Sequence, residues 1–506
     1  MDTELIEALR RAKRTQIDGA RPDAVARVHA NRKMTARERI GALLDDDSMV
    51  EYGAIAAQTR DGDWVAEAGG VDFVGTIDGQ VVVASSTDYT DHGGGYGGGR
   101  LGRLFALAHE HRWPVVIFVD GGGSRARHPR VGLGHVELSG SIGRFTVIDG
   151  MAELSGWVPT VAIVSGPSFA GHASLAAFSD FLIATHGSSI GMGGPPMVEA
   201  ALGKRLTPHE LASVEMHETS GGIDLLVANE QDAIDAARRY LAFYRDQPSG
   251  EPSAAAAGLD ALMADVPHRV PGNVSGNVSG NVSDKVPDEL PDKNGAYDMA
   301  AVIEALVDAD SMFELRSGFA RSLITALARI NGRSVGILAN QPLVDDGYID
   351  ENAATKIARF VELCDAYEYP IISLIDTPGC VVRWRDRRDK GGEVSVEPGI
   401  TRSHARPIIA HQHRTVPLFS VQIGRGRGLG PTLMGGFSSA RGVPPLCLAW
   451  PSVEIGRTDG FSTIRNANTF DDVVAPSETR ERIIRVMRHI PRKLDRVEKK
   501  RPIDTF

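Results

Sequence analysis

The same order of structural elements is predicted twice in this chain, once on each side of a central low-complexity stretch. Each copy opens with a polar turn that leads into an apolar strand, a pattern typical of a β-hairpin. A helix, and then a buried strand that ends in an acidic turn, follow in both copies. The turn, strand, helix and strand-turn segments occupy residues 76–79, 81–83, 101–111 and 114–123 in the first copy, and residues 329–332, 335–338, 354–367 and 370–379 in the second.

Two further segments close each copy. A strand runs into a glycine-rich turn, and an Asp-x-x-Val-Ala segment then precedes a helix. These segments lie at residues 161–172 and 224–228 in the first copy, and at residues 419–430 and 471–475 in the second. Strands that alternate with helices indicate βαβ units, whose parallel strands are buried on both faces. Because several elements recur in one order, we predict an α/β chain built by internal duplication.

A compositional break separates the two copies. Residues 248–291 are rich in Pro, Ser, Ala and Gly and contain three repeats of Gly-Asn-Val-Ser. Such a stretch buries too little apolar area to order itself, which predicts a linker. We therefore expect one domain over residues 1–247 and another over residues 292–506.

The two ends of the chain carry charged helical patterns. Residues 4–32 are expected to form a charged helix, and Thr35 with Glu38 three residues later is a capping-box pattern that starts a helix through Leu44. Near the C-terminus, residues 480–501 are basic, with apolar residues at helical spacing at Ile483, Ile484 and Met487. A solvated helix face explains this charge better than a binding patch.

Composition excludes several classes of protein. A formal charge of -10 over 506 residues argues against a nucleic-acid surface. No apolar run reaches the roughly 18 residues that a membrane span needs, and the charged N-terminus does not resemble a signal peptide. Only three cysteines are present, which argues against a disulfide framework and against a four-cysteine zinc site. We expect a cytoplasmic protein without a metal site.

A series of different short motifs extends along nearly the whole chain, apart from the linker and an insertion at residues 380–398. They occupy residues 35–40 (TARERI), 88–90 (DYT), 120–125 (DGGGSR), 340–342 (NQP), 363–366 (LCDA), 376–379 (DTPG), 449–451 (AWP) and 472–480. In this order they resemble the carboxyltransferase (beta) subunits of biotin-dependent acyl-CoA carboxylases of the acetyl-, propionyl- and methylcrotonyl-CoA type. Each motif alone is weak evidence for this family, whereas the order in which all of them occur is specific to it.

The resemblance implies an α/β fold of two tandem crotonase-like (ClpP/crotonase) superhelical βαβ domains. It also implies a hexamer built from dimers, with the active site between the N-terminal half of one subunit and the C-terminal half of its partner. Acyl-CoA would lie mainly on the N-terminal half and carboxybiotin mainly on the C-terminal half. The chain has no Met-Lys-Met biotinylation site and no phosphate loop of the ATP-grasp type. The expected partners are therefore a biotin carboxylase and a biotin carboxyl carrier protein, with biotin carried on the partner and coenzyme A as part of the substrate.

Carboxyl transfer next to a thioester places negative charge on the thioester oxygen. Backbone N–H groups aimed at that oxygen lower the barrier, and small residues let the backbone approach. The resemblance places one such oxyanion hole at Ala170 and Gly171 and a second, for the biotin ureido oxygen, at Leu429 and Gly430. Alanine in place of a family glycine still carries an N–H. The oxyanion hole is therefore expected to survive, provided that φ is negative at this residue. In this family the base is the released biotin, so no catalytic His or Cys is expected.

Other residues are expected around these two turns. On the acyl-CoA side, Arg125, with Arg127 and Arg130, would meet CoA phosphates or remain solvated. His172 follows the first turn and is more typical of a structural histidine than of a substrate contact. The full set of candidates is Gly122, Gly123, Arg125, His172, Gly191, Met192 and Gly193 on the acyl-CoA side and Gly379, Gly426 and Gly428 on the biotin side.

Two departures from the family keep other functions open. The insertion carries Trp384 among arginines, which suits stacking and anion contact as well as a surface excursion. Residues 456–461 lack the Gly-Ala that the family carries near biotin. The alternatives are a carboxyacyl-CoA decarboxylase, a biotin-independent crotonase-type enzyme, and a non-catalytic assembly partner of an active homologue. The sequence fixes neither the acyl chain nor the direction of the reaction.

Overall fold

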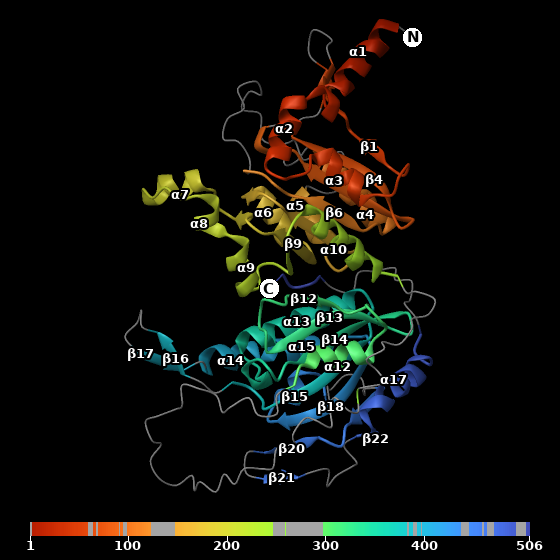
Figure 1. Cartoon of the computed structure of the whole chain (residues 1–506), viewed down its shortest axis with the longest axis vertical. Helices are drawn as coiled ribbons and strands as arrows, with labels where there is room; N and C mark the ends of the chain where they lie inside the picture. The colour runs from red at the N-terminus through yellow and green to blue at the C-terminus, as the bar shows by residue number, and fades with distance from the viewer. Residues whose placement is uncertain are drawn as a thin grey trace. The chain divides into compact units, whose positions relative to one another are not determined.

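The chain divides into two compact units, the first comprising Met1–Tyr244 with Glu498–Thr505 and the second Arg245–Val497 with Phe506. A computed structural model gives the fold of each (Figure 1). The structure describes residues 3–58, 64–66, 69–90, 92–94, 99–122, 147–245, 259, 297–381, 384–387, 392–395, 397–436, 445–457, 460–462, 470–491 and 502–505.

The first unit is built on a seven-stranded sheet in the order β1-β4-β5-β6-β7-β9-β11. Its strands are β1 (Val50–Tyr52), β4 (Gly70–Ile77), β5 (Gln80–Thr87), β6 (Val115–Phe118), β7 (Thr160–Val164), β9 (Phe181–Thr185) and β11 (Leu225–Val227). The pairs β1–β4 and β4–β5 are antiparallel, and every later pair is parallel. The helices that connect or cover them are α3 (Ala36–Leu43), α4 (Gly99–His111), α5 (Val147–Leu154), α6 (Gly171–Ala177) and α10 (Glu230–Ala242).

The second unit repeats this sheet strand for strand. Its matching order is β12-β13-β14-β15-β18-β19-β22, again with two antiparallel pairs followed by parallel ones. These strands are β12 (Phe313–Leu315), β13 (Leu323–Ile330), β14 (Arg333–Asn340), β15 (Ile371–Thr377), β18 (Leu418–Arg427), β19 (Leu446–Ala449) and β22 (Asp472–Val473). Its helices include α12 (Met299–Leu306), α13 (Glu351–Ala366), α15 (Ala405–His413) and α17 (Thr479–Met487). The predicted duplication of βαβ units is confirmed.

Shorter elements complete the described chain. In the first unit these are α1 (Thr3–Arg14), η1 (Asp18–Ala20), α2 (Pro22–Ala30), β2 (Ile55–Gln58), β3 (Trp64–Ala66), η2 (His92–Gly94), β8 (Pro167–Phe169), β10 (Ser189–Gly191), α7 (Pro195–Leu202), α8 (Pro208–Ala212) and α9 (Val214–Ser220). In the second they are η4 (Asp345–Gly347), β16 (Trp384–Arg387), β17 (Gly392–Ser395), α14 (Glu397–Ser403), α16 (Gly430–Leu433), β20 (Glu454–Arg457), β21 (Gly460–Ser462) and η7 (Pro476–Glu478). Among the helices that the structure describes, none has the length and apolar character to cross a membrane.

An aspartate fixes the hairpin turn of each unit in the same way. Asp45 accepts hydrogen bonds from the N–H groups of Asp78 and Gly79 at 3.0 and 2.9 Å. Asp308 accepts from Asn331 and Gly332 at 2.8 Å each. The signal for this match is a repeat in the sequence, ALLDDDSMVE at residues 42–51 and ALVDADSMFE at residues 305–314, which the sequence analysis missed.

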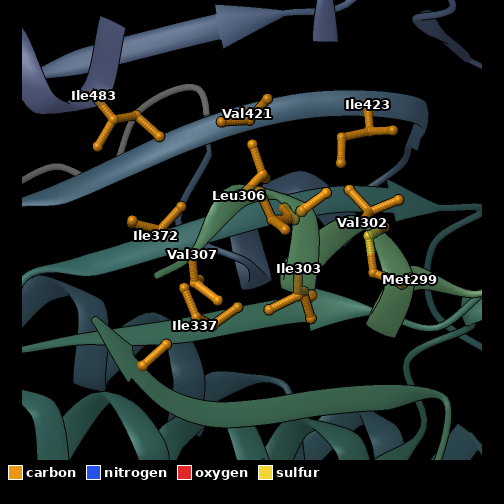
Figure 2. Close-up of a cluster of buried hydrophobic side chains, with 14 of the residues drawn as sticks. Met299, Val302, Ile303, Leu306, Val307, Ile337, Ile372, Val421, Ile423 and Ile483 are labelled. Atoms are coloured by element: carbon orange, nitrogen blue, oxygen red, sulfur yellow. The ribbon is translucent and has the colours of Figure 1, made fainter. Parts of the chain in front are cut away.

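The core of the second unit lies between its sheet and the helices on one face. Figure 2 shows Met299, Val302, Ile303 and Leu306 of α12 facing side chains of the central strands. The strand residues of this cluster include Ile337, Ile372, Val421 and Ile423, and Ile483 of α17 joins them. Leu259, from the stretch predicted to be a linker, is only 1% exposed and belongs to the same cluster. That stretch therefore contributes at least one side chain to a core.

The N-terminal segment differs from its prediction. Residues 4–32 form two helices, α1 and α2, rather than one, and Pro22 begins the second. Proline suits a first helical position, which explains where α2 begins, whereas α1 already ends at Arg14. The capping box is confirmed, since Thr35 Oγ1 accepts from Glu38 N at 3.1 Å and the Glu38 carboxylate accepts from Thr35 N at 2.8 Å. At the C-terminus, Ile483 and Met487 are buried as the helical spacing indicated, while residues 492–501 lie outside the described residues.

Candidate functional site

A buried carboxylate lies beyond the end of β6 in the first unit. Asp120 Oδ1 accepts hydrogen bonds from the N–H groups of Ser165 and Gly166 at 2.9 Å each. Its Oδ2 accepts from Ser165 Oγ at 2.8 Å and from Arg39 Nη2 at 2.7 Å. Burial raises the pKa of Asp120, but Arg39 and the hydrogen bonds lower it further, so the pKa lies below its usual range. The carboxylate therefore fixes the backbone where β7 turns into β8.

The turn after β8 differs from expectation at Ala170. Its φ is +53° and its ψ is -119°, whereas the sequence analysis required a negative φ. These angles are those of the first central residue of a type II′ turn, a position that glycine usually occupies. The Ala170 N–H donates to the Gly191 carbonyl at 3.1 Å, because β8 pairs with β10. In this conformation the Ala170 N–H is already engaged.

Gly171 is the more open residue of the pair. It begins α6, and a Cβ built on it would meet no described atom within 4 Å. Among the described residues, none accepts a hydrogen bond from its N–H. A backbone donor beside open space is what an approaching carbonyl oxygen needs.

His172 packs inside the turn. Its side chain is 9% exposed, Nε2 lies 3.0 Å from the Gly94 carbonyl oxygen, and burial lowers its pKa. A Cβ on Gly121 would lie 2.4 Å from the ring, so glycine is needed there. The histidine thus holds residues 94 and 121 together, in keeping with the structural role that the sequence favoured.

The remaining acyl-CoA candidates are dispersed around this turn. The Gly191 carbonyl receives the Ala170 N–H, whereas Met192 is 69% exposed and its sulfur lies 3.9 Å from Ser174 Oγ. Gly193 has open space where a Cβ would be, and the Gly122 N–H donates to Gly93 at 3.2 Å. Gly123, Arg125, Arg127 and Arg130 lie outside the described residues.

Replacing Ala170 with glycine is expected to stabilise the first unit by about 1 kcal/mol, because a non-glycine residue at this positive φ is strained. The control is Ala173→Gly on α6, where glycine is expected to lower stability by about 1 kcal/mol or more. Thermal unfolding of the two variants should therefore shift in opposite directions. A lower melting temperature for Ala170→Gly would contradict strain at this residue.

The second unit carries a matching carboxylate at the end of β15. Asp376 Oδ1 accepts from the N–H and Nε of Arg425 at 3.0 and 2.7 Å. Tyr297 donates its hydroxyl to Asp376 Oδ2 at 3.1 Å. Burial, and next the Asp376 charge, raise the pKa of Tyr297 well above its usual value, so the phenol stays protonated. Arg425 also reaches Asp346, with Nη1 2.6 Å from Oδ2.

The five biotin-side candidates come together around one turn. Thr377 pairs with Gly426 across β15 and β18, and a Cβ on Gly379 would lie 3.1 Å from the Arg427 carbonyl oxygen. A Cβ on Gly430 would lie 2.6 Å from Thr377 Cγ2, so this glycine is needed for packing. Gly428, with φ +54°, has open space around the Cβ position, and the Leu429 side chain is 49% exposed. Among the described residues, none therefore crowds the Cβ position of Gly428, and Leu429 is half exposed.

The insertion contains a two-stranded hairpin. Strands β16 and β17 pair in antiparallel fashion, from Trp384↔Ser395 to Arg387↔Gly392. Arg383 and Arg388 lie outside the described residues, as do all side chains of the hairpin. The altered segment near residue 456 also forms a hairpin, with Ile455↔Ser462 and Arg457↔Gly460 paired. Across the described parts of the chain, no three His, Cys, Asp or Glu side chains gather as metal ligands.

Comparison with known proteins gives a consistent result. The family described as the carboxyl transferase domain matches residues 27–464. The acetyl-/propionyl-coenzyme A carboxylase beta5 subunit of Mycobacterium tuberculosis is 32% identical over 86% of this chain and 75% of its own length. The methylmalonyl-CoA carboxyltransferase 12S subunit of Propionibacterium freudenreichii is 31% identical over 85% of this chain and 77% of its own. A crystal structure of the transcarboxylase 12S hexamer, with methylmalonyl-coenzyme A and methylmalonic acid bound, superimposes with a TM-score of 0.76 at 28% identity, covering 95% of each chain.

Proposed function

The chain belongs to the carboxyltransferase (beta) subunit family of biotin-dependent acyl-CoA carboxylases, and we propose that it moves a carboxylate from biotin on a carrier protein to the α (or vinylogous) carbon of an acyl-CoA. The fold is a tandem of two crotonase-like domains, and the chain is a carboxyl-transferring enzyme component. One observation carries the proposal. Each unit places a glycine-rich turn after topologically matched strands, β7 and β18, beside a buried aspartate.

On the acyl-CoA side, we assign Gly171 as a donor to the thioester oxygen. No described residue accepts a hydrogen bond from its N–H and no described atom lies within 4 Å of its Cβ position, whereas the Ala170 N–H would first have to leave the Gly191 carbonyl. Negative charge grows on the thioester oxygen as the α carbon loses its proton, so a donor placed there stabilises the transition state more than the ground state. His172 supports the turn without acting as a base.

On the biotin side, the turn from Gly426 to Gly430 is the proposed cradle. Gly428 and Leu429 leave backbone accessible, which fits a flat ureido group approaching the main chain. Biotin bound there would supply the carboxyl group, with one N–C bond broken for each C–C bond formed and the α proton passing to its ureido nitrogen. The residues of the turn then only need to bind and orient it.

The relatives support a proposal for the assembly. We propose that the chain works with a biotin carboxylase and a biotin carboxyl carrier protein, and that it forms a hexamer like that described for the 12S subunit. The active site would then lie between the first unit of one subunit and the second unit of another.

The full-length protein, isolated from its own cells, is expected to co-purify with a biotinylated chain and to carboxylate an acyl-CoA with that complex. Streptavidin blotting tests the first expectation, and fixation of labelled bicarbonate into acetyl-, propionyl- and methylcrotonyl-CoA tests the second. Coenzyme A binding without a biotinylated partner would favour a biotin-independent crotonase-type enzyme. Decarboxylation of methylmalonyl-CoA without transfer would favour a decarboxylase. A protein that shows neither coenzyme A binding nor turnover would favour a non-catalytic assembly partner.

A further inference from the structure

Asp120 and Asp376 occupy the same place in the two duplicated sheets. Phe118 of β6 pairs with Ile163 of β7, and Leu374 of β15 pairs with Val421 of β18. Each aspartate lies two residues beyond the paired strand residue and is buried, with 2% and 5% of its surface exposed. Asp120 accepts the N–H groups of Ser165 and Gly166 just after β7, and Asp376 accepts the N–H of Arg425 near the end of β18.

The first aspartate anchors the chain that leads into the acyl-CoA turn. Its carboxylate holds Ser165 and Gly166 at the start of β8. Its neighbour Gly121 pairs with β8 directly, donating to the Pro167 carbonyl at 2.7 Å and accepting from Phe169 N at 2.8 Å. The main chain from Ser165 to Phe169 is therefore anchored to the aspartate segment immediately before Ala170 and Gly171.

The second aspartate controls the biotin-side turn through an arginine. Asp376 binds both the backbone and the side chain of Arg425, three residues before Gly428. The residues after Asp376 continue the contact, because Thr377 pairs with Gly426 and Gly379 packs against Arg427 and Gly430. A Cβ on Gly424 would lie 2.6 Å from the Asp376 carboxyl carbon, as one on the matching Gly166 would lie 3.4 Å from that of Asp120.

The charges around the two aspartates match although they come from different elements. Arg39 of α3 lies between Asp120 and Glu230, at 2.7 and 2.5 Å. Arg425 of β18 lies between Asp376 and Asp346, at 2.7 and 2.6 Å. A duplication alone would have kept the arginine in one place. An arginine supplied to each aspartate by a different element indicates that a fixed carboxylate is what each turn requires.

We infer that Asp120 and Asp376 are positioning residues, the first orienting the acyl-CoA turn at Gly171 and the second orienting the biotin turn at Gly428 and Leu429. The inference rests on the proposed function for the identity of the two ligands. It assigns the two halves of the reaction to separate carboxylates that touch neither substrate. Because each aspartate acts on its own turn, a substitution at one of them should weaken the binding of one substrate and leave the binding of the other unchanged.

The test uses the full-length protein, methylmalonyl-CoA as carboxyl donor and free biotin as acceptor. Asp120→Asn is expected to raise KM for methylmalonyl-CoA by about tenfold or more and to change KM for biotin by less than about twofold, since misplaced positioning groups cost this much. Asp376→Asn is expected to do the reverse. Both should lower kcat. A shift of both KM values together in each variant, or of neither, would overturn the inference.

Milder variants guard against loss of folding. Ser165→Ala removes one hydrogen bond to Asp120, and Tyr297→Phe removes one to Asp376, while both leave the backbone N–H bonds in place. Ser165→Ala is expected to raise only the KM for methylmalonyl-CoA, and Tyr297→Phe only the KM for biotin, each by about two- to fivefold. Equal effects on both substrates would count against positioning even if the asparagine variants fail to fold.

Amide hydrogen exchange gives a readout that does not depend on turnover. Asp120→Asn should speed exchange in residues 165–174, and Asp376→Asn should speed it in residues 425–436, each without a change in the other segment. If the wild-type protein transfers no carboxyl group but these local changes occur, the proposed function fails and positioning stands. If transfer occurs and exchange changes in both segments or in neither, positioning fails and the proposed function stands.

Discussion

Gly171→Val is expected to lower the rate of carboxyl transfer by about 10²- to 10³-fold, the size of effect seen when one oxyanion donor is lost. The valine side chain would occupy the open space beside the Gly171 N–H, where no described atom lies within 4 Å of the Cβ position. The thioester oxygen would then be held away from the donor. Because the position is the start of α6, a branched side chain disturbs no preceding helical turn.

The measurement is steady-state transfer from methylmalonyl-CoA to biotin, together with thermal unfolding. The matched control is Gly41→Val on an exposed position of α3, where a Cβ also meets nothing within 4 Å. This control should retain the wild-type rate within about twofold, since surface substitutions have small effects. A Gly171→Val protein with the wild-type rate would show that Gly171 is not the donor. One that melts well below the wild type would trace the loss of activity to folding.

The sequence predicted the fold well because the central strands are buried on both faces and therefore carry apolar runs. All seven residues of β15 are buried, and so are all eight residues of β14. Runs of this kind, each followed by glycine or aspartate at fixed places, are visible without any knowledge of pairing. The helices at residues 101–111 and 354–367 were found for a related reason, since each lies between two such runs. The order of elements was therefore predictable.

The partners of the buried charges were not predictable in the same way. Arg39 reaches Asp120 from 81 residues away and Glu230 from 191 residues away. Nothing in a single sequence states which arginine joins which carboxylate. The acidic residue in the motif at residues 120–125 was noticed as part of a turn, whereas its role in holding Ser165 and Gly166 appears only once β6 and β7 are paired.

The conformation of Ala170 was missed for a different reason. Alanine strongly prefers negative φ, so sequence alone favours that state. Pairing of β8 with β10 instead draws the Ala170 N–H to the Gly191 carbonyl, and the chain can then enter α6 only through a positive φ. Tertiary hydrogen bonding overrides the local preference here. The family glycine at this position is the signal that could have revealed it.

Arg39→Met is expected to lower the free energy of unfolding of the first unit by about 3–5 kcal/mol, because it leaves two carboxylates buried without their cation. Arg39, Asp120 and Glu230 expose only 7%, 3% and 2% of their side chains. Methionine fills similar volume, so the loss is electrostatic rather than a cavity. The measurement is urea unfolding followed by a signal from the first unit, with the transition midpoint compared at equal pH.

The matched control lies two residues away on the same helix. Arg37 binds the Glu51 carboxylate through both guanidinium nitrogens at 3.1 and 2.8 Å, but 21% and 27% of these two side chains remain exposed. Arg37→Met should therefore cost at most about 1 kcal/mol, as partly exposed pairs do. Equal losses for the two variants would mean that α3 docking, rather than the buried charge, sets the stability.

Adding Glu230→Gln to Arg39→Met should restore part of the lost free energy of unfolding. The double variant thereby distinguishes the contribution of Glu230 from that of Asp120. Glutamine keeps a carbonyl oxygen for the Met34 N–H, which donates to Glu230 at 2.5 Å, while it removes one buried negative charge. Asp120 still accepts from Ser165 and Gly166, so its charge remains partly compensated. The double variant is therefore expected to recover about half of the lost stability, a coupling that contacting residues commonly show. If the two losses simply add, Glu230 and Arg39 act independently, and Asp120 alone requires the arginine.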